Sequence, residues 1–143
     1  MNGNDARHVK RSKRFLSRDI TAEATVFPGG IRVSVYGGDH PGLGAVSVVS
    51  PEGRITTTQF SGRCDGEITQ QWAEALCGGG LLPAVVDAGV HYDDLSPAGI
   101  GEMLRQSQAL LDALVEDIMN EQGNEDDTDR ERRARCCAGA YGR

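Results

Sequence analysis

The residues best suited to chemistry gather in the segment VYGGDHPGLGAV, residues 35–46, where one aspartate and one histidine stand among glycines. Asp39 and His40 are side chains of the types that bind ligands and transfer protons. Glycines let backbone N–H groups point into a concavity, which can bind an anion without lysine. The loop Gly37–Gly44 matches neither G-x-G-x-x-G before a helix nor G-K-[ST]. The residues alone leave two interpretations open, a wide structural turn and an anion site.

A second polar cluster, DAGVHYDD, occupies residues 87–94. His91 and Asp93 are two apart, so on an extended chain their side chains fall on the same face. Gly89 interrupts the apolar run, which indicates a bulge or a close backbone approach. His91 is either a hydrogen-bonded structural histidine, with Asp93 helping to cap the next helix, or part of a site with His40. Neither a metal-ligand spacing nor a catalytic motif is present, so we expect no catalytic residue and no metal.

Hydrophobic patterning predicts an α+β fold. Apolar alternation or short apolar runs between glycine and proline turns predict strands at residues 20–27, 31–36, 44–50, 54–60 and 81–92. The short turns predict that the first four strands form an antiparallel meander. One helix is expected at residues 67–78, and a long one begins after Ser96, a good N-cap, with Pro97 in its first turn. The expected architecture is ββββαβα, an antiparallel-rich sheet of about five strands covered on one face by two helices.

The charge distribution divides the chain into three segments. Residues 1–18 carry six basic groups and one acid, and we expect a disordered basic arm, with a contact to nucleic acid or to an acidic partner as the alternative. Residues 19–120, the expected domain, lack lysine, which argues against nucleic-acid binding. Residues 121–143 are polar and mixed in charge, and we expect a disordered tail. The cations of the domain are Arg32, Arg54, Arg63 and Arg105.

Hydropathy argues against a membrane segment. No apolar run approaches the roughly 18–20 residues of a transmembrane helix. The basic N-terminal stretch is not followed by an apolar stretch of signal-peptide length. We therefore expect a cytoplasmic protein that does not bind membranes.

Two segments, YGGDHPGLGAVSVV and VVDAGVHYDDLSPAGI, resemble the paired signatures of the prenylated-flavin chaperone family (LpdD-like proteins). The likeness spans about residues 31–118 and includes a weaker third segment around SGRCDGE, residues 61–67. Members of this family accompany UbiD-type decarboxylases that act on aromatic acids. The family fold looks related to proteasome-assembly chaperones, which tend to form dimers.

The resemblance implies a non-catalytic accessory protein that binds prenylated FMN (or FMN) and supports maturation of a UbiD-type decarboxylase. It also implies a homodimer or higher homo-oligomer. One alternative is a ligand-free dimeric assembly chaperone or interaction module. Another is a small enzyme or decarboxylase subunit that uses His91 with Asp93 as an acid–base pair.

The resemblance also implies which residues contact the cofactor. The loop would wrap the flavin phosphate, with His91 and Asp93 approaching from the last strand. Gly42 stands where the family usually has histidine, and Arg63 and Cys64 replace a histidine and a lysine of the weaker segment. The expected cofactor-binding residues are Gly37, Gly38, Asp39, His40, Pro41, Gly42, Gly44, Arg63, Gly89, His91 and Asp93.

Overall fold

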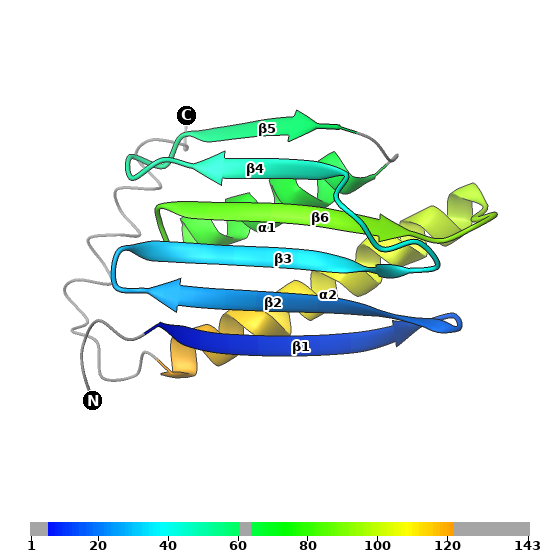
Figure 1. Cartoon of the computed structure of the whole chain (residues 1–143), viewed down its shortest axis with the longest axis horizontal. Coiled ribbons are helices and arrows are strands. Elements are labelled where there is room, and N and C mark those ends of the chain that lie inside the picture. The colour runs from blue at the N-terminus through cyan, green and yellow to red at the C-terminus, as the bar shows by residue number, and fades with distance from the viewer. Residues whose placement is uncertain (1–5, 61–63, 122–143) are drawn as a thin grey trace.

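The computed structural model describes residues 6–60 and 64–121, which form a six-stranded sheet with both helices on one face (Figure 1). The α+β class is confirmed, with six strands in place of about five. In chain order the elements are β1 (Arg7–Phe15), β2 (Arg18–Phe27), β3 (Gly30–Gly38), β4 (Ala45–Val49), β5 (Ile55–Gln59), α1 (Asp65–Gly78), β6 (Ala84–His91) and α2 (Pro97–Glu121).

The two helices divide the covered face of the sheet between them. α1 packs on β6, β4 and β5, while α2 runs across β1 and β2 (Figure 1). Trp72 of α1 is 1% exposed, and its indole N–H donates a hydrogen bond to Ser107 Oγ of α2 at 3.2 Å. This bond satisfies the one polar group of a large buried side chain and ties the helices together.

The strand order is β1-β2-β3-β6-β4-β5, with β3 and β6 parallel and every other pair antiparallel. The two hairpins β2–β3 and β4–β5 agree with the predicted turns. The predicted four-strand meander is wrong, because β6 lies between β3 and β4. The chain must therefore cross one whole strand, a span of about 10 Å between next-nearest strands, which requires a long connection after β3.

The prediction of a disordered basic arm is wrong for Arg7–Phe15, which form β1. Val9 and Phe15 are 7% and 8% exposed because they pack on the covered face. Arg11 makes a two-point ion pair with Asp117 of α2, at 2.6 and 3.0 Å. The basic side chains suit an edge strand, since charges discourage pairing with another chain. The predicted tail over residues 122–143 lies outside the described residues.

The long helix begins as predicted. Ser96 Oγ accepts a hydrogen bond from the Gly99 N–H at 3.1 Å, which satisfies one of the free donors of the first turn, and Pro97 is the first helical residue. In the described part of the chain, neither helix has the length and apolar character needed to cross a membrane.

Candidate functional site

The loop between β3 and β4 crosses over the end of β6. Four of its backbone N–H groups donate to carbonyls of β6: Asp39 and His40 to His91 (2.7 and 3.2 Å), Gly42 to Gly89 (3.2 Å) and Gly44 to Ala88 (2.7 Å). These bonds hold the loop against the strand along its whole length. Two of these groups belong to glycines, Gly42 and Gly44, and the interpretation that they point into an anion-binding concavity is wrong for them, since each already has an acceptor.

The glycines are required by the closeness of this crossing. A Cβ on Gly89 would lie 1.8 Å from the carbonyl oxygen of Gly42, and one on Gly44 would lie 1.9 Å from Asp65 Oδ2. Gly38 has φ of +85°, and a Cβ there would lie 2.2 Å from the His91 carbonyl oxygen. A side chain at these positions would push the loop away from β6. Packing therefore explains the glycines at positions 38, 44 and 89, whereas a Cβ on Gly42 meets nothing within 4 Å.

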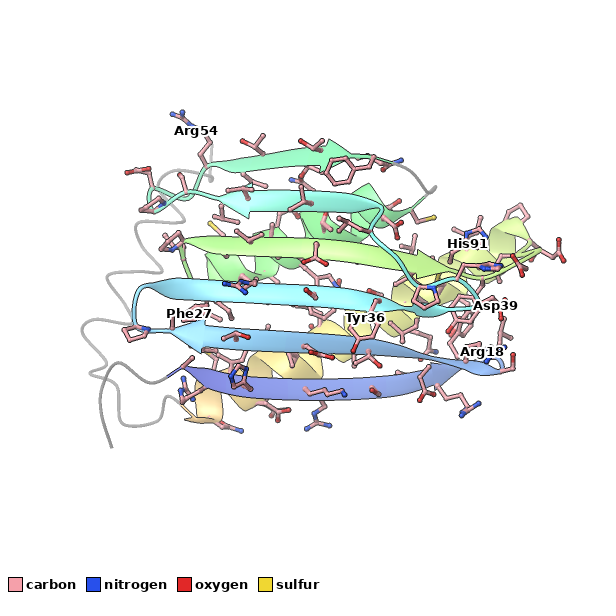
Figure 2. All side chains as sticks on the ribbon, viewed as in Figure 1. Arg18, Phe27, Tyr36, Asp39, Arg54 and His91 are labelled. Atoms are coloured by element: carbon pink, nitrogen blue, oxygen red, sulfur yellow. The ribbon has the colours of Figure 1, made fainter. Side chains whose placement is uncertain are left out.

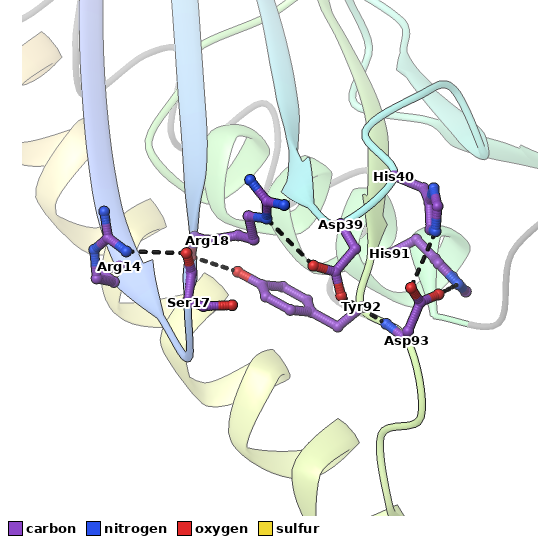
Figure 3. Close-up of polar contacts among 8 residues, drawn as sticks. All are labelled: Arg14, Ser17, Arg18, Asp39, His40, His91, Tyr92 and Asp93. Carbon is purple, nitrogen blue, oxygen red and sulfur yellow. Dashed lines mark hydrogen bonds and ion pairs between the residues drawn. The ribbon is translucent and has the colours of Figure 1, made fainter.

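One carboxylate joins the two histidines at this end of the sheet (Figure 3). Asp93 Oδ2 lies 3.1 Å from His40 Nε2, and Asp93 Oδ1 lies 3.4 Å from His91 Nε2. The two imidazole rings are 5.5 Å apart between centroids. All three side chains are about half or more exposed. The loop and the end of β6 thus bring together groups that are far apart in the sequence, and they remain accessible to a ligand.

Asp39 anchors the base of this cluster. Its Oδ2 accepts the Asp93 backbone N–H at 3.0 Å, and its Oδ1 lies 3.4 Å from Arg18 Nε. The hydrogen bond from the Asp93 backbone, together with Arg18, holds the pKa of Asp39 below its usual value. Figure 2 places Arg18, Asp39 and His91 at one end of the sheet. Asp39 therefore fixes the turn that carries Asp93 toward the histidines.

Tyr92 supports the same turn from the buried side. Its hydroxyl donates to the Arg18 carbonyl at 2.9 Å (Figure 3). Its ring packs edge-on against Phe15 with centroids 5.1 Å apart. Burial is the main cause that raises the pKa of Tyr92 to about 12. This residue is structural and connects the site to the β1–β2 turn.

Asp65, the first residue of α1, is a site residue that the sequence-based selection missed. Its side chain is buried, with the residue 4% exposed, and its Oδ1 accepts the Val90 N–H at 3.1 Å. Burial raises the pKa of Asp65 above its usual value, although the Val90 hydrogen bond and His91 act in the opposite direction. The one signal in the sequence that pointed to Asp65 was its position in SGRCDGE, the weaker segment of the family resemblance.

These groups surround a hollow of about 380 Å³, which we call the polar hollow. A volume of this size is typical of small-molecule sites. Gly37, Gly38, Asp39 and Pro41 belong to the same loop but are not among its lining residues, and Arg63 lies outside the described residues. The lining residues are His40, Gly42, Leu43, Gly44, Asp65, Gly89, His91 and Asp93.

A larger hollow of about 530 Å³ lies at the opposite end of the sheet, where Phe27, Val48 and Val85 make it largely apolar. It lacks the convergent ionisable groups of the polar hollow. Within residues 6–60 and 64–121, no group of three histidine, cysteine or acidic side chains could hold a metal ion.

The fold and the polar hollow define a small α+β protein with a ligand-sized site at the carboxyl end of two parallel strands. The family described as prenylated flavin chaperone LpdD-like domain matches residues 15–119. The chain belongs to this family, and so to a class of accessory proteins rather than of enzymes. A search of curated proteins found no match.

Proposed function

We propose that this protein binds prenylated FMN in the polar hollow and delivers it to a UbiD-type decarboxylase. The observation that carries the proposal is the convergence of the two segments that resemble the family signatures on one hollow. The cofactor supplies the decarboxylation chemistry in the partner enzyme, whereas this chain holds and orients it.

The residues of the hollow fit a flavin in size and in chemistry. Its volume of about 380 Å³ falls within the range of cofactor sites. The Nε2 atoms of His40 and His91 face the Asp93 carboxylate, so Nδ1 of each ring is available to a ligand. Asp65 has one carboxylate oxygen for which no donor is found among the described residues. A flavin carries both donors and acceptors that could pair with these groups.

Roles follow for the remaining expected binding residues. Gly37, Gly38 and Gly44 allow the loop to lie on β6, and Asp39 holds the turn that carries Asp93. Pro41 and Gly42 are exposed at the crest of the loop, where a bound ligand could contact the backbone. Arg63, outside the described residues, follows Gly62 shortly before α1 and would supply a cation for the flavin phosphate.

The direct test is co-elution of reduced prenylated FMN with the purified full chain under anaerobic gel filtration, followed by absorbance. The wild type should retain the cofactor, and His91→Asn should lose most of it. His8→Asn is the matched control, because His8 lies on β1 with Thr25 as its partner, at the end of the sheet away from the hollow. Retention of the cofactor by His91→Asn, or none by the wild type, would contradict the proposal.

We also propose a homodimer or higher homo-oligomer, formed through the sheet face that no helix covers. Phe27, Val48 and Val85 expose 38–46% of their surface on this face. Val48 and Val85 are neighbours across β4 and β6, and Phe27, with Arg32 over its ring, lines the same hollow. Exposed apolar side chains grouped in this way mark interaction surfaces. Phe27→Ser should lower the molar mass measured by light scattering.

The uncovered face also favours the second candidate, a ligand-free assembly chaperone. That candidate predicts that Phe27→Ser abolishes support of the decarboxylase while His91→Asn leaves it intact. The cofactor proposal predicts that His91→Asn abolishes this support. Decarboxylase activity after co-expression with each variant therefore decides between the two.

A further inference from the structure

The polar hollow offers mainly hydrogen-bond acceptors, whereas a phosphate group needs donors. Four N–H groups of the overlying loop already donate to β6. Asp65 and Asp93 contribute carboxylates to the lining. The lining residues that can become cationic are His40 and His91, and Asp93 lies within 3.4 Å of both rings. A dianionic phosphate placed here would meet carboxylates at close range, which is unfavourable in a partly desolvated site.

Asp65 gives the hollow a specific acceptor. The residue is 4% exposed, and its Oδ1 is occupied by the Val90 N–H. Its Oδ2 points toward Gly44, and within residues 6–60 and 64–121 no donor reaches it. Buried carboxylate oxygens without a donor are rare in folded proteins, because an unmet acceptor costs free energy. A ligand that donates an N–H or O–H group would meet this requirement.

We propose that the polar hollow binds the hydrogen-bond-donating part of the flavin, the ring N–H or the ribityl hydroxyls, with Asp65 as the specificity-determining acceptor, and that the phosphate lies outside it. This inference rests on the proposed function, since it assigns the orientation of the same cofactor. It replaces the expectation that the glycine loop wraps the phosphate.

The test compares two ligands, reduced prenylated FMN and the same compound after phosphatase treatment, by anaerobic equilibrium binding. The proteins are the full-length wild type, Asp65→Asn, Asp93→Asn and Asp94→Asn. Asp94 is the matched control, because it is exposed, does not line the hollow and has φ of +59°, a conformation that asparagine tolerates.

Asp65→Asn should weaken both ligands by about 10- to 100-fold, the value of one hydrogen bond to a charged acceptor. Asp93→Asn should weaken both as well, and Asp94→Asn should change neither. The affinity ratio between the two ligands should be the same in every protein, because the phosphate does not contact the varied carboxylates.

Two results would overturn the inference while leaving the proposed function intact. One is tighter binding of the phosphorylated ligand alone in Asp65→Asn or Asp93→Asn, since removing a carboxylate would then relieve repulsion of the phosphate. The other is unchanged binding of both ligands in Asp65→Asn. No binding by the wild type would instead refute the proposed function, and with it this inference.

Two further measurements complete the design. Thermal unfolding checks that Asp65→Asn is folded, and its melting temperature at neutral pH should rise because a buried charge is removed.

The prenylated ring without a ribityl chain distinguishes the two donor sources. If this ring still binds Asp65→Asn more weakly than the wild type, the donor is the ring N–H, and if it binds both equally, the donors are the ribityl hydroxyls.

Discussion

Replacing Gly89 by alanine tests whether the loop crossing holds the site together. A Cβ at Gly89 would lie 1.8 Å from the Gly42 carbonyl oxygen and 2.1 Å from its carbon, both of which are backbone atoms that cannot rotate away. The loop must lift, which strains or breaks the hydrogen bonds from Gly42 and Gly44 to β6. Overpacking costs about 1–3 kcal/mol, and each lost hydrogen bond costs about 0.5–1.5 kcal/mol.

We therefore expect Gly89→Ala to lower the free energy of unfolding by about 2–4 kcal/mol, and the melting temperature by roughly 8–16 °C. Urea unfolding followed by circular dichroism measures the first quantity and thermal scans the second. Gly42→Ala is the control from the same contact, because a Cβ on Gly42 meets nothing within 4 Å. It should change stability by less than about 1 kcal/mol. Equal effects of the two substitutions would refute the reasoning.

Three further substitutions test the electrostatics and hydrogen bonds of the site. Asp65 has a raised pKa, so its contribution to stability is present below its pKa in the unfolded chain and is lost as the pH rises through its pKa in the folded protein. Asp65→Asn should therefore raise the free energy of unfolding at pH 7 by about 1 kcal/mol. Urea unfolding that shows no gain in stability would contradict this. Asp39 has a lowered pKa, so its contribution to stability is present above pH 3.8 and is lost as the pH falls through its pKa in the folded protein. Between pH 5 and 2, the melting temperature of Asp39→Asn should therefore fall less steeply than that of the wild type. Tyr92→Phe removes the hydrogen bond to the Arg18 carbonyl and should cost about 1 kcal/mol in urea unfolding, whereas an unchanged midpoint would show that this bond does not stabilise the turn.

Local signals in the sequence were enough to predict the two hairpins and both helices. The turns at Pro28–Gly30 and Pro51–Gly53 join strands that do pair, because short connections between strands permit only antiparallel neighbours. Ser96 and Pro97 marked the start of α2 for an equally local reason.

The insertion of β6 between β3 and β4 was not predictable in the same way. Parallel pairing joins residues far apart in the chain, and Val33 and Val86 carry no mark of their partnership. The length of the loop Gly37–Gly44 was the available signal, since crossing a strand needs more residues than a hairpin. The residues alone left a wide structural turn and an anion site open as interpretations of this loop, and neither of them included a crossing over β6.

β1 and Asp65 were missed because charge concealed their structural roles. In Arg7–Phe15, Val9 and Phe15 are the buried apolar residues, and basic side chains around them hide the strand period. Asp65 resembles an ordinary acidic residue in the first turn of a helix. Its burial depends on contacts with Val90 and Gly44, which belong to distant strands and loops.

The most direct test of the central claim is to monitor the three histidines of the chain by NMR during titration with reduced prenylated FMN. His40 and His91 lie at the polar hollow, whereas His8 lies on β1 at the other end of the sheet. Binding at the hollow predicts saturable changes in the imidazole resonances of His40 and His91 at one common affinity, with His8 unchanged. Cofactor binding that leaves the resonances of His40 and His91 unmoved would contradict the account.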